Sequence, residues 1–242
     1  MTRTILALSL LLHGVPVARG DPPKFIVWNV GQGLWVTWSS ATECLHFDMG
    51  GEFADRAGVA GECGQKKNAV VFSHWDWDHI NFAGVGRRLL KNLCVLQWPG
   101  GDTNAVKLAY LKRLPDCDWR PRAALLELKA VVRGSLTANG ASRVFVFKGA
   151  LLPGDSDGRA ERYWSPFARP HKPAVLILGH HGSRTSTTPQ LVRALERTRT
   201  AIASARKRVY GHPHSIVVSR LRSAGISVLP TEDWGHVVFT SP

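Results

Sequence analysis

Short apolar runs recur along the chain from residue 24 onward, each bounded by glycine, proline or a polar cluster. Runs that are rich in β-branched and aromatic residues predict β-strands, whereas apolar residues at helical spacing predict helices. The predicted strands are residues 24–30, 34–38, 44–48, 69–72, 93–98, 125–132, 143–147, 174–178, 200–204, 226–229 and 236–239. The predicted helices are residues 87–90, 103–114, 189–197 and 215–224.

The order of these elements indicates a layered α/β protein. The early strands follow one another as in hairpins and the later strands alternate with helices, so we expect helices to cover the faces of sheets. Polar and charged clusters follow several strands, which is where α/β folds gather functional groups. The 242 residues contain no internal repeat and no linker, and they suffice for one domain with a large core.

Residues 1–20 have the layout of a secretory signal peptide. Arg3 supplies a positive start, residues 5–12 are apolar, and small residues at positions 18 and 20 precede a predicted cut before residue 21. The alternative is a buried N-terminal helix or strand. We therefore expect an exported protein, periplasmic or secreted, whose folded domain is residues 21–242. No apolar run reaches the ~20 residues that cross a bilayer, so no membrane span is expected.

Four cysteines agree with export. Cys44 lies near Cys63 in the sequence, and Cys94 lies near Cys117, so two local disulfides are plausible in an oxidising compartment. The alternative is four buried free thiols that pack as small hydrophobic groups. The absence of a CxxC pair argues against a zinc ribbon and against a thioredoxin-like redox site.

The charge balance narrows the class of partner. Lysine and arginine number 31 against 18 acidic residues, which gives a net charge of +13 and favours polyanionic partners or substrates. The alternative is a generally basic, solvated surface. A hydrophobic fraction of 44%, with nine tryptophans and nine phenylalanines, excludes a disordered chain. The basic clusters are Arg87, Arg88 and Lys91; Lys112 and Arg113; Arg206 to Arg208; and Arg220 and Arg222.

The densest chemistry follows the predicted strand 69–72. His74, Asp76, Asp78 and His79 supply four metal-ligating side chains within six positions, and burying them all without partners would be prohibitively costly. Mixed imidazole and carboxylate ligands suit zinc, manganese or iron. We therefore predict a divalent metal site here. Trp75 and Trp77 alternate with these ligands and should point away from them, to pack in the interior or, alternatively, to stack on bases.

Two further segments carry candidate ligands after apolar strands. Asp155 follows Gly154, where a ligand or an ordinary turn residue is expected, and the pair His180-His181 follows the strand 174–178. The sequence leaves open which histidine is the ligand, and the other is free for substrate contact or proton transfer. Nearby polar residues could hold a phosphate or, alternatively, cap the next helix. These residues are Ser183, Arg184 and Ser186.

Taken together, these blocks show a family resemblance. The chain resembles the metallo-β-lactamase superfamily and, within it, the soluble hydrolase domain of ComEC-type DNA-uptake proteins. We expect that domain to stand here without the membrane segments of the channel, and the matching blocks follow in family order. They are residues 29–33 (NVGQG), 46–51 (HFDMGG), 73–79 (SHWDWDH), 151–155 (LLPGD), 177–183 (ILGHHGS), 209–214 (VYGHPH) and 230–235 (PTEDWG).

The resemblance implies a four-layer αββα sandwich with one or two metal ions, zinc or manganese, between the two sheet edges. It also implies that Asp48 orients the ligand loop. The implied ligands are His74 and Asp76 for one ion, Asp78, His79 and either His180 or His181 for the other, and Asp155 as a bridge between them.

One departure from the family pattern concerns the first metal site. Many members have a further ligating histidine between the His-rich loop and the bridging aspartate, but no histidine lies between His79 and His171 here. His171, His212 or Asp157 could substitute. His212 is also expected to face the substrate, whereas His214 could cap the helix that starts at residue 215. The other expected substrate contacts are Arg206, Lys207, Arg208 and Tyr210.

These observations predict an exported, metal-dependent hydrolase, a phosphodiesterase or nuclease that acts on DNA through metal-activated water. The similar domain of uptake proteins is thought to degrade one strand. Two alternatives remain: a small-molecule metallo-hydrolase (a lactonase, β-lactamase or phosphorylcholine-esterase-like enzyme), and a catalytically weak nucleic-acid-binding protein. The partner is then DNA or another phosphodiester. The expected catalytic residues are Asp78, Asp155, His181 and His212.

Overall fold

The structure, a computed structural model, describes residues 22–128 and 137–240. The predicted signal peptide, residues 1–20, lies outside the described residues, and so do residues 129–132 of the predicted strand 125–132. Within the described part of the chain, no helix is long and apolar enough to cross a membrane.

Two six-stranded sheets form the centre of the fold. In each, strands at one edge pair antiparallel and strands toward the other edge pair parallel. In order, the first sheet contains β12 (Val237–Thr240), β1 (Lys24–Val27), β2 (Val36–Ser39), β3 (Glu43–Phe47), β4 (Lys67–Val71) and β5 (Cys94–Gln97). In order, the second contains β11 (Ser227–Pro230), β10 (Thr200–Ala203), β9 (Val175–Ile177), β8 (Ala150–Leu152), β7 (Phe145–Phe147) and β6 (Leu126–Glu127).

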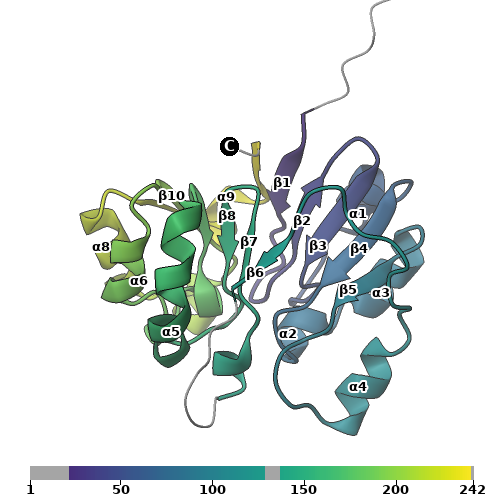
Figure 1. The fold of residues 1–242 in the computed structure, drawn as a ribbon, viewed down its shortest axis with the longest axis horizontal. Helices are drawn as coiled ribbons and strands as arrows, with labels where there is room; N and C mark the ends of the chain where they lie inside the picture. Colours follow the sequence, from purple (N-terminus) through teal and green to yellow (C-terminus); the bar gives the residue numbers. More distant parts are fainter. Residues whose placement is uncertain (1–21, 129–136, 241–242) are drawn as a thin grey trace, which may run out of the picture.

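Helices cover the outer faces of both sheets, so the molecule has the predicted four layers (Figure 1). On the side of the first sheet are α1 (Arg56–Cys63), α2 (Trp77–Ile80), α3 (Ala83–Leu89) and α4 (Ala105–Leu111). On the side of the second are α5 (Gly158–Ala168), α6 (Pro189–Ala194) and α8 (Ser215–Ser223). Shorter turns of helix are α7 (Lys207–Tyr210), α9 (Thr231–Trp234), η1 (Asn139–Ala141), η2 (Arg169–His171) and η3 (Gly179–Gly182).

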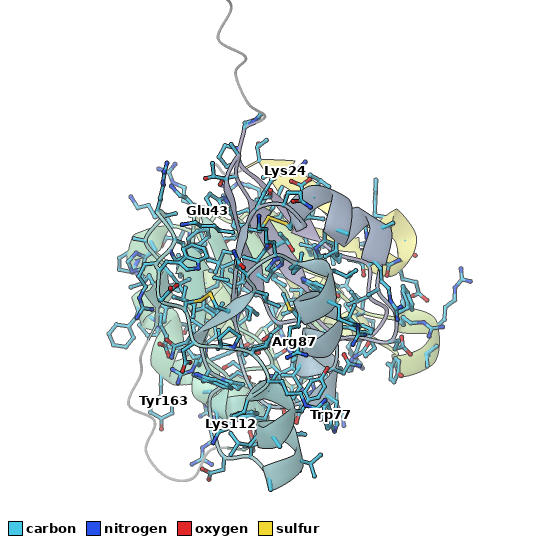
Figure 2. All side chains as sticks on the ribbon, turned by 90° about the vertical axis from the view of Figure 1, so that its right-hand side faces the viewer. Lys24, Glu43, Trp77, Arg87, Lys112 and Tyr163 are labelled. Carbon is cyan, nitrogen blue, oxygen red and sulfur yellow. A yellow bond between two sulfur atoms is a disulfide. The ribbon has the colours of Figure 1, made fainter. Side chains whose placement is uncertain are left out.

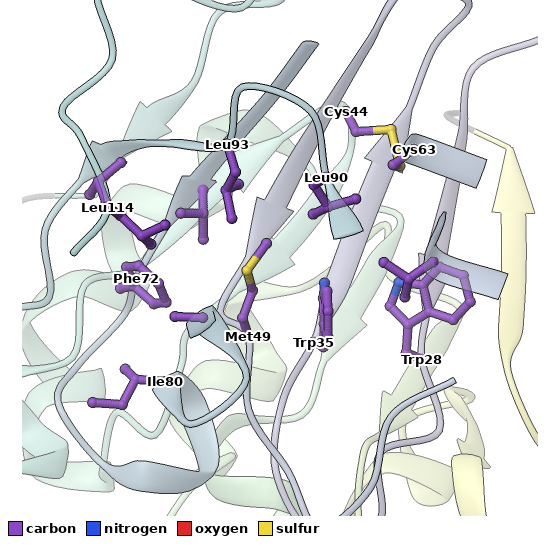
Figure 3. Packing of buried hydrophobic residues seen from close by; sticks show 14 of the residues in the cluster. Trp28, Trp35, Cys44, Met49, Cys63, Phe72, Ile80, Leu90, Leu93 and Leu114 are labelled. Atoms are coloured by element: carbon purple, nitrogen blue, oxygen red, sulfur yellow. A yellow bond between two sulfur atoms is a disulfide. The ribbon is translucent and has the colours of Figure 1, made fainter. Parts of the chain in front are cut away.

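The alternation of side chains along the strands explains why four layers form. In β1, Phe25 and Val27 point into the core between the sheets, whereas Ile26 points to the core beneath the helices. A sheet that is apolar on both faces must be covered on both, here by the other sheet and by helices. Figure 3 shows the helix-side core of the first sheet, in which Trp35 and Met49 pack at the centre.

The predicted strands are found with ends that shift by a few residues, but two helices have weak sequence signals. Helix α1 (RAGVAGEC) contains two glycines, which lower helix propensity, and it begins at Asp55, whose carboxylate accepts from the Gly58 N–H. Helix α5 contains Pro166, which interrupts the helical pattern. Both helices form because they cover sheet faces: Val59 and Cys63 of α1, and Trp164 of α5, are buried.

Both local disulfides predicted from the sequence are present, so the alternative of four free thiols is wrong. Cys44 of β3 is bonded to Cys63 at the end of α1, and the bond therefore ties the outer helix layer to the sheet (Figure 3). Cys94 of β5 is bonded to Cys117, in the loop that follows α4.

We expect the Cys94→Ala/Cys117→Ala double variant to lose about 3 kcal/mol in the free energy of unfolding, because the bond closes a loop with a sequence separation of 23. Denaturant unfolding of the oxidised proteins measures this loss. Reduction of the wild type should lower its stability further than this variant, since reduction opens both bonds. An unchanged midpoint for the variant would contradict the expectation.

A buried polar network crosses the first sheet at His46. Its Nδ1 lies 3.2 Å from the indole N–H of Trp35 and 2.9 Å from the hydroxyl of Thr37, and its Nε2 lies 3.1 Å from Oδ1 of Asn68. Nδ1 therefore accepts and Nε2 donates, which satisfies the neutral ring completely. Burial lowers the pKa of His46 from 6.5 to about 4, although the hydrogen bond to Asn68 opposes this shift.

Because His46 stays neutral in the folded chain down to a pKa of about 4, the unfolded chain binds one more proton between that value and 6.5. Folding stability should therefore fall as the pH is lowered through this window, with a contribution from His46 of about 1.4 kcal/mol per pH unit. We expect a shallower slope for His46→Gln in urea unfolding from pH 7 to 4, with His171→Gln as the matched control at an exposed position. Equal slopes of folding stability against pH for the wild type and His46→Gln would contradict this prediction.

Candidate metal centre

The candidate residues converge because each follows the carboxyl end of a strand. Asp48 follows β3, and the loop 73–79 follows β4, its parallel neighbour. Asp155 follows β8, and the pair His180-His181 follows β9, which is parallel to β8. Figure 2 shows Trp77 of the loop at the end of the molecule opposite Lys24, where the first strand begins. One end of the sandwich thus gathers the ligands from both sheets.

Glycines allow the ligand loop to approach the first sheet closely. A Cβ atom at Gly50 would stand 2.3 Å from the carbonyl oxygen of Asp78, and one at Gly33, where φ is +139°, would stand 2.6 Å from the same atom. Leu34 donates its N–H to that carbonyl at 3.0 Å, and Met49 donates to the carbonyl of His79 at 2.8 Å. The glycines of the NVGQG and DMGG segments therefore let the backbone be held from two sides.

Asp48 organises the loop from beneath. Its carboxylate accepts from the backbone N–H and the hydroxyl of Ser73, both at 2.7 Å, and lies 2.8 Å from Nδ1 of His79. The bond to Nδ1 leaves Nε2 of His79 as the ring nitrogen that faces the site. Burial disfavours a charged His79, but the carboxylates of Asp155 and Asp48 outweigh it and hold the pKa of His79 well above 6.5.

Asp155 lies at the centre of four histidines. Its Oδ1 is 3.1 Å from Nε2 of His79, and its Oδ2 is 3.6 Å from Nε2 of His181. The Nε2 atoms of His74 and His180 each lie 3.9 Å from Oδ2. Burial favours the neutral acid, but the positive charges of His79 and His181 outweigh it and hold the pKa of Asp155 well below 3.8.

Two sets of side chains are arranged to hold a divalent ion. The ligand atoms of His74, His79 and Asp155 lie within 4.8 Å of one another, and so do those of Asp78, His79 and His181. Within the described residues, Nε2 of His74 is buried and has no hydrogen-bond partner. A metal ion would coordinate this nitrogen. Imidazole and carboxylate ligands suit zinc or manganese. The residues present therefore fit the metal that the sequence predicts.

The remaining acidic ligands lie at the mouth of the site. Asp76 is 39% exposed and lies 3.5 Å from Nε2 of His74 and 3.2 Å from the ammonium of Lys107. The nearby His74 ring and the ammonium of Lys107 lower the pKa of Asp76 to about 2, against the effect of burial. Asp78 lies 3.1 Å from Nε2 of His181, and this contact lowers its pKa although partial burial acts in the opposite direction.

The two adjacent histidines have different environments. Both have left-handed backbone angles, with φ of 48° for His180 and 55° for His181. Nδ1 of His181 lies 2.9 Å from the carbonyl of Ser204, so Nε2 faces Asp78 and Asp155. His180 is 28% exposed and contacts the amide of Asn139 at 3.2 Å. The sequence left open which of the two histidines is the ligand, and this geometry favours His181.

The predicted phosphate-binding residues have different positions. Ser186 is buried and its hydroxyl donates to the carbonyl of Gly179 at 2.7 Å, which argues against the substrate contact predicted for it. Ser183 is buried beside Thr185, and only Arg184 of the predicted set is exposed. Neither serine caps α6, because that role belongs to Thr188. His214 does cap α8, as the sequence suggested.

Residues of the 206–212 segment contact Glu52, Gln32 and His180 beside the ligand cluster. Arg206 pairs with Glu52 at 3.1 Å, and Tyr210 donates its hydroxyl to the same carboxylate at 3.0 Å. Nδ1 of His212 lies 3.2 Å from the amide nitrogen of Gln32, and its ring stands 6.1 Å from that of His180. The side chains of Lys207 and Arg208 are exposed and therefore free to meet a substrate.

Two other expectations are wrong in part. His171 is exposed in η2, and Asp157 caps α5 and bonds to Thr137, so neither joins the ligand clusters in place of the missing histidine. Trp75 packs in the core as predicted, with its indole donating to the Gly101 carbonyl. Trp77 instead is 42% exposed and packs on Tyr110 at the surface.

Sequence reasoning did not single out three residues that contact the site. Ser73 bonds to Asp48 and lies 3.0 Å from Nδ1 of His74. Asn139 contacts His180, and Gln32 contacts His212. Gln32 lies within the NVGQG block, so its position in a matching block was the available signal. Asn139 has no such signal, because its position depends on the course of the chain before β7.

Comparison with known proteins finds two sequence relatives of this chain. The chain is 30% identical to Competence protein ComA of Neisseria gonorrhoeae over 227 residues, 88% of this chain and 31% of ComA. It is also 30% identical to ComE operon protein 3 of Bacillus subtilis over 89 residues, 37% of this chain and 12% of that protein. The chain therefore spans about a third or less of these relatives. No protein-family profile matches it.

Solved structures identify the fold. The metallo-β-lactamase fold protein YhfI from Bacillus subtilis superposes with a TM-score of 0.56 over 90% of this chain and 99% of its own, at 15% identity. This chain is a metallo-β-lactamase-fold protein. A diphosphatase from the PhnP family superposes on this metallo-β-lactamase-fold chain with a TM-score of 0.51, covering 90% of it and 97% of the diphosphatase, also at 15% identity.

Two variants distinguish the roles of His180 and His181 in metal binding at this metallo-β-lactamase-fold site. We expect His181→Ala to lower the affinity for Zn²⁺ or Mn²⁺ at least tenfold, since it removes a ligand nitrogen that faces Asp78 and Asp155. His180→Ala should leave the affinity within about threefold, because this ring lies at the edge of the cluster. Isothermal titration of the apo-protein with each metal measures both, and the reverse order of affinities would contradict the assignment.

Proposed function

We propose that the chain is an exported, metal-dependent phosphodiesterase whose substrate is DNA. The observation that carries this proposal is the convergence of His74, Asp78, His79, Asp155 and His181 at one end of the sandwich, where the buried Nε2 of His74 has no hydrogen bond within the described residues. A divalent ion held by these side chains would activate water and stabilise charge on a phosphoryl oxygen.

The protein's own residues supply the rest of the proposed chemistry. His79 belongs to both ligand sets, and Asp155 lies 3.1 Å from Nε2 of His79 and 3.6 Å from Nε2 of His181. Asp48 fixes the orientation of His79, so that the ligands are arranged before substrate arrives. Asp76 and Asp78 are partly exposed and leave an open side for a phosphate. His212 stands beside His180 at the edge of the cluster, and the exposed side chains of Arg184, Lys207 and Arg208 are proposed to contact the phosphate backbone.

Charge and relatives favour DNA as the substrate. The net charge of +13 attracts a polyanion, and a neutral lactone or lactam would gain nothing from it. The relative that matches over 88% of this chain is a competence protein. Two disulfides in the described residues support an oxidising compartment and hence export.

The proposal is tested by incubating the purified protein with single- and double-stranded DNA in Mn²⁺, in Zn²⁺ and with a chelator. We expect metal-dependent cleavage that Asp155→Asn lowers by at least a hundredfold, because this variant loses a ligand charge that lies beside histidines of both ligand sets. Asp118→Asn, an exposed aspartate outside the clusters, is the matched control and should retain full activity.

Other outcomes distinguish the alternatives. If DNA binds with steep salt dependence but stays intact with every metal, the chain is a nucleic-acid-binding protein and the proposed activity is wrong. If DNA neither binds nor is cleaved while a small phosphoester or lactone is hydrolysed, the substrate class is wrong. Full activity in Asp155→Asn would remove the metal-centred chemistry itself.

A further inference from the structure

Two hydrogen bonds in series link the two halves of the sandwich beside the metal centre. The backbone N–H of Arg206 donates to Oε1 of Gln32 at 3.2 Å. The side-chain Nε2 of Gln32 lies 3.2 Å from Nδ1 of His212. Gln32 comes from the loop between β1 and β2, whereas Arg206 and His212 come from the segment after β10. One amide side chain thus joins the first sheet's loop to two points of the second sheet's loop.

The order of donors and acceptors in this series fixes the proton on His212. A backbone N–H can only donate, so the oxygen of the Gln32 amide faces Arg206 and its NH₂ group faces His212. The NH₂ group can only donate, so Nδ1 of His212 must carry a lone pair. In the neutral ring, the proton is therefore on Nε2.

Glu52 stabilises this series of hydrogen bonds from one side. Its carboxylate accepts from the backbone N–H of Gln32 at 2.8 Å and from the guanidinium of Arg206 at 3.1 Å. It also accepts from the hydroxyl of Tyr210 at 3.0 Å. Glu52 therefore holds the Gln32 loop and the 206–212 segment in the register that the two serial bonds require.

The remaining nitrogen of His212 is available for a ligand. The His212 ring is half-buried and packs edge-to-face on His180, with 6.1 Å between ring centroids. Within the described residues no hydrogen bond involves its Nε2. A half-buried N–H beside a metal centre, held in one orientation and without a protein acceptor, is suited to an anionic oxygen of a substrate.

We propose that Gln32 is a positioning residue that locks His212 in the Nε2–H tautomer, so that His212 donates a hydrogen bond to a non-bridging phosphoryl oxygen. This inference rests on the proposed phosphodiesterase function. No proton is transferred in this role: the Nε2–H proton stays on the ring, and its dipole stabilises charge that develops on the phosphate. His212 is then a hydrogen-bond donor and not a general base.

The lock is tested without activity, by ¹⁵N NMR of the full chain loaded with Zn²⁺ and labelled at histidine. We expect the His212 proton on Nε2 in the wild type, with its signals assigned by their loss in His212→Gln. In Gln32→Glu the carboxylate can only accept, so a proton should appear on Nδ1. Gln65→Glu adds the same charge at an exposed position and should leave the wild-type pattern.

The donor role is tested by DNA cleavage. His212→Gln keeps an amide N–H near the position of Nε2 and should retain kcat within about tenfold, whereas His212→Ala should lose about a hundredfold, as for removal of a donor to developing charge. Gln32→Leu removes both hydrogen bonds of the amide and leaves the His212 ring free to turn and to take either tautomer, so it should lower kcat, with KM changed less. Gln65→Glu should match the wild type.

Each adverse result identifies what is wrong. A proton on Nδ1 in the wild type, or an unchanged tautomer in Gln32→Glu, overturns the lock. Equal losses in His212→Gln and His212→Ala overturn the donor role and favour a base. If the wild type cleaves no DNA, the proposed function and the donor role fail together, whereas the NMR experiment still decides the lock.

Discussion

The carboxylate of Asp48 is the contact on which the metal centre depends. It accepts hydrogen bonds from the backbone N–H and the hydroxyl of Ser73 and contacts Nδ1 of His79. These contacts attach the ligand loop to the end of β3. Without this buried anion, the loop 73–79 would have no partner for its first N–H, and the ring of His79 could turn either nitrogen toward the site. Asp48 has a left-handed backbone conformation, with φ of 55°, and its carboxylate reaches the residue that follows β4, the parallel neighbour of β3.

The rest of the fold keeps the strand ends of the first sheet close to those of the second sheet. Alternating apolar residues in β1 to β4 require cover on both faces, and the second sheet supplies it on one side. Because Asp155 and His181 follow strands of that second sheet, packing between the sheets also sets the distances in the ligand cluster. Stability and site geometry are therefore determined by the same apolar contacts.

The strands and the ligand loop were predictable because they depend on local signals: apolar runs, turn residues and a dense group of ligating side chains. The four layers were implied by the family resemblance. Other features depend on distant contacts. Nothing local distinguishes His180 from His181, since the choice is made by the carbonyl of Ser204. Ser186 carries the same hydroxyl as a phosphate-binding serine, but its position beneath Gly179 buries it. Helices α1 and α5 form against their sheets despite internal glycine and proline.

The distribution of the disulfides has a consequence for the way the two halves cohere. Both lie in the first sheet and its helices, which also carry His74, Asp78 and His79. Asp155 and His181 belong to the other half, which has no covalent link of this kind within the described residues. A divalent ion bound by both sets would act as a cross-link between a covalently braced half and an unbraced one. The free metal concentration around the protein would then help to decide how tightly the second half closes on the first.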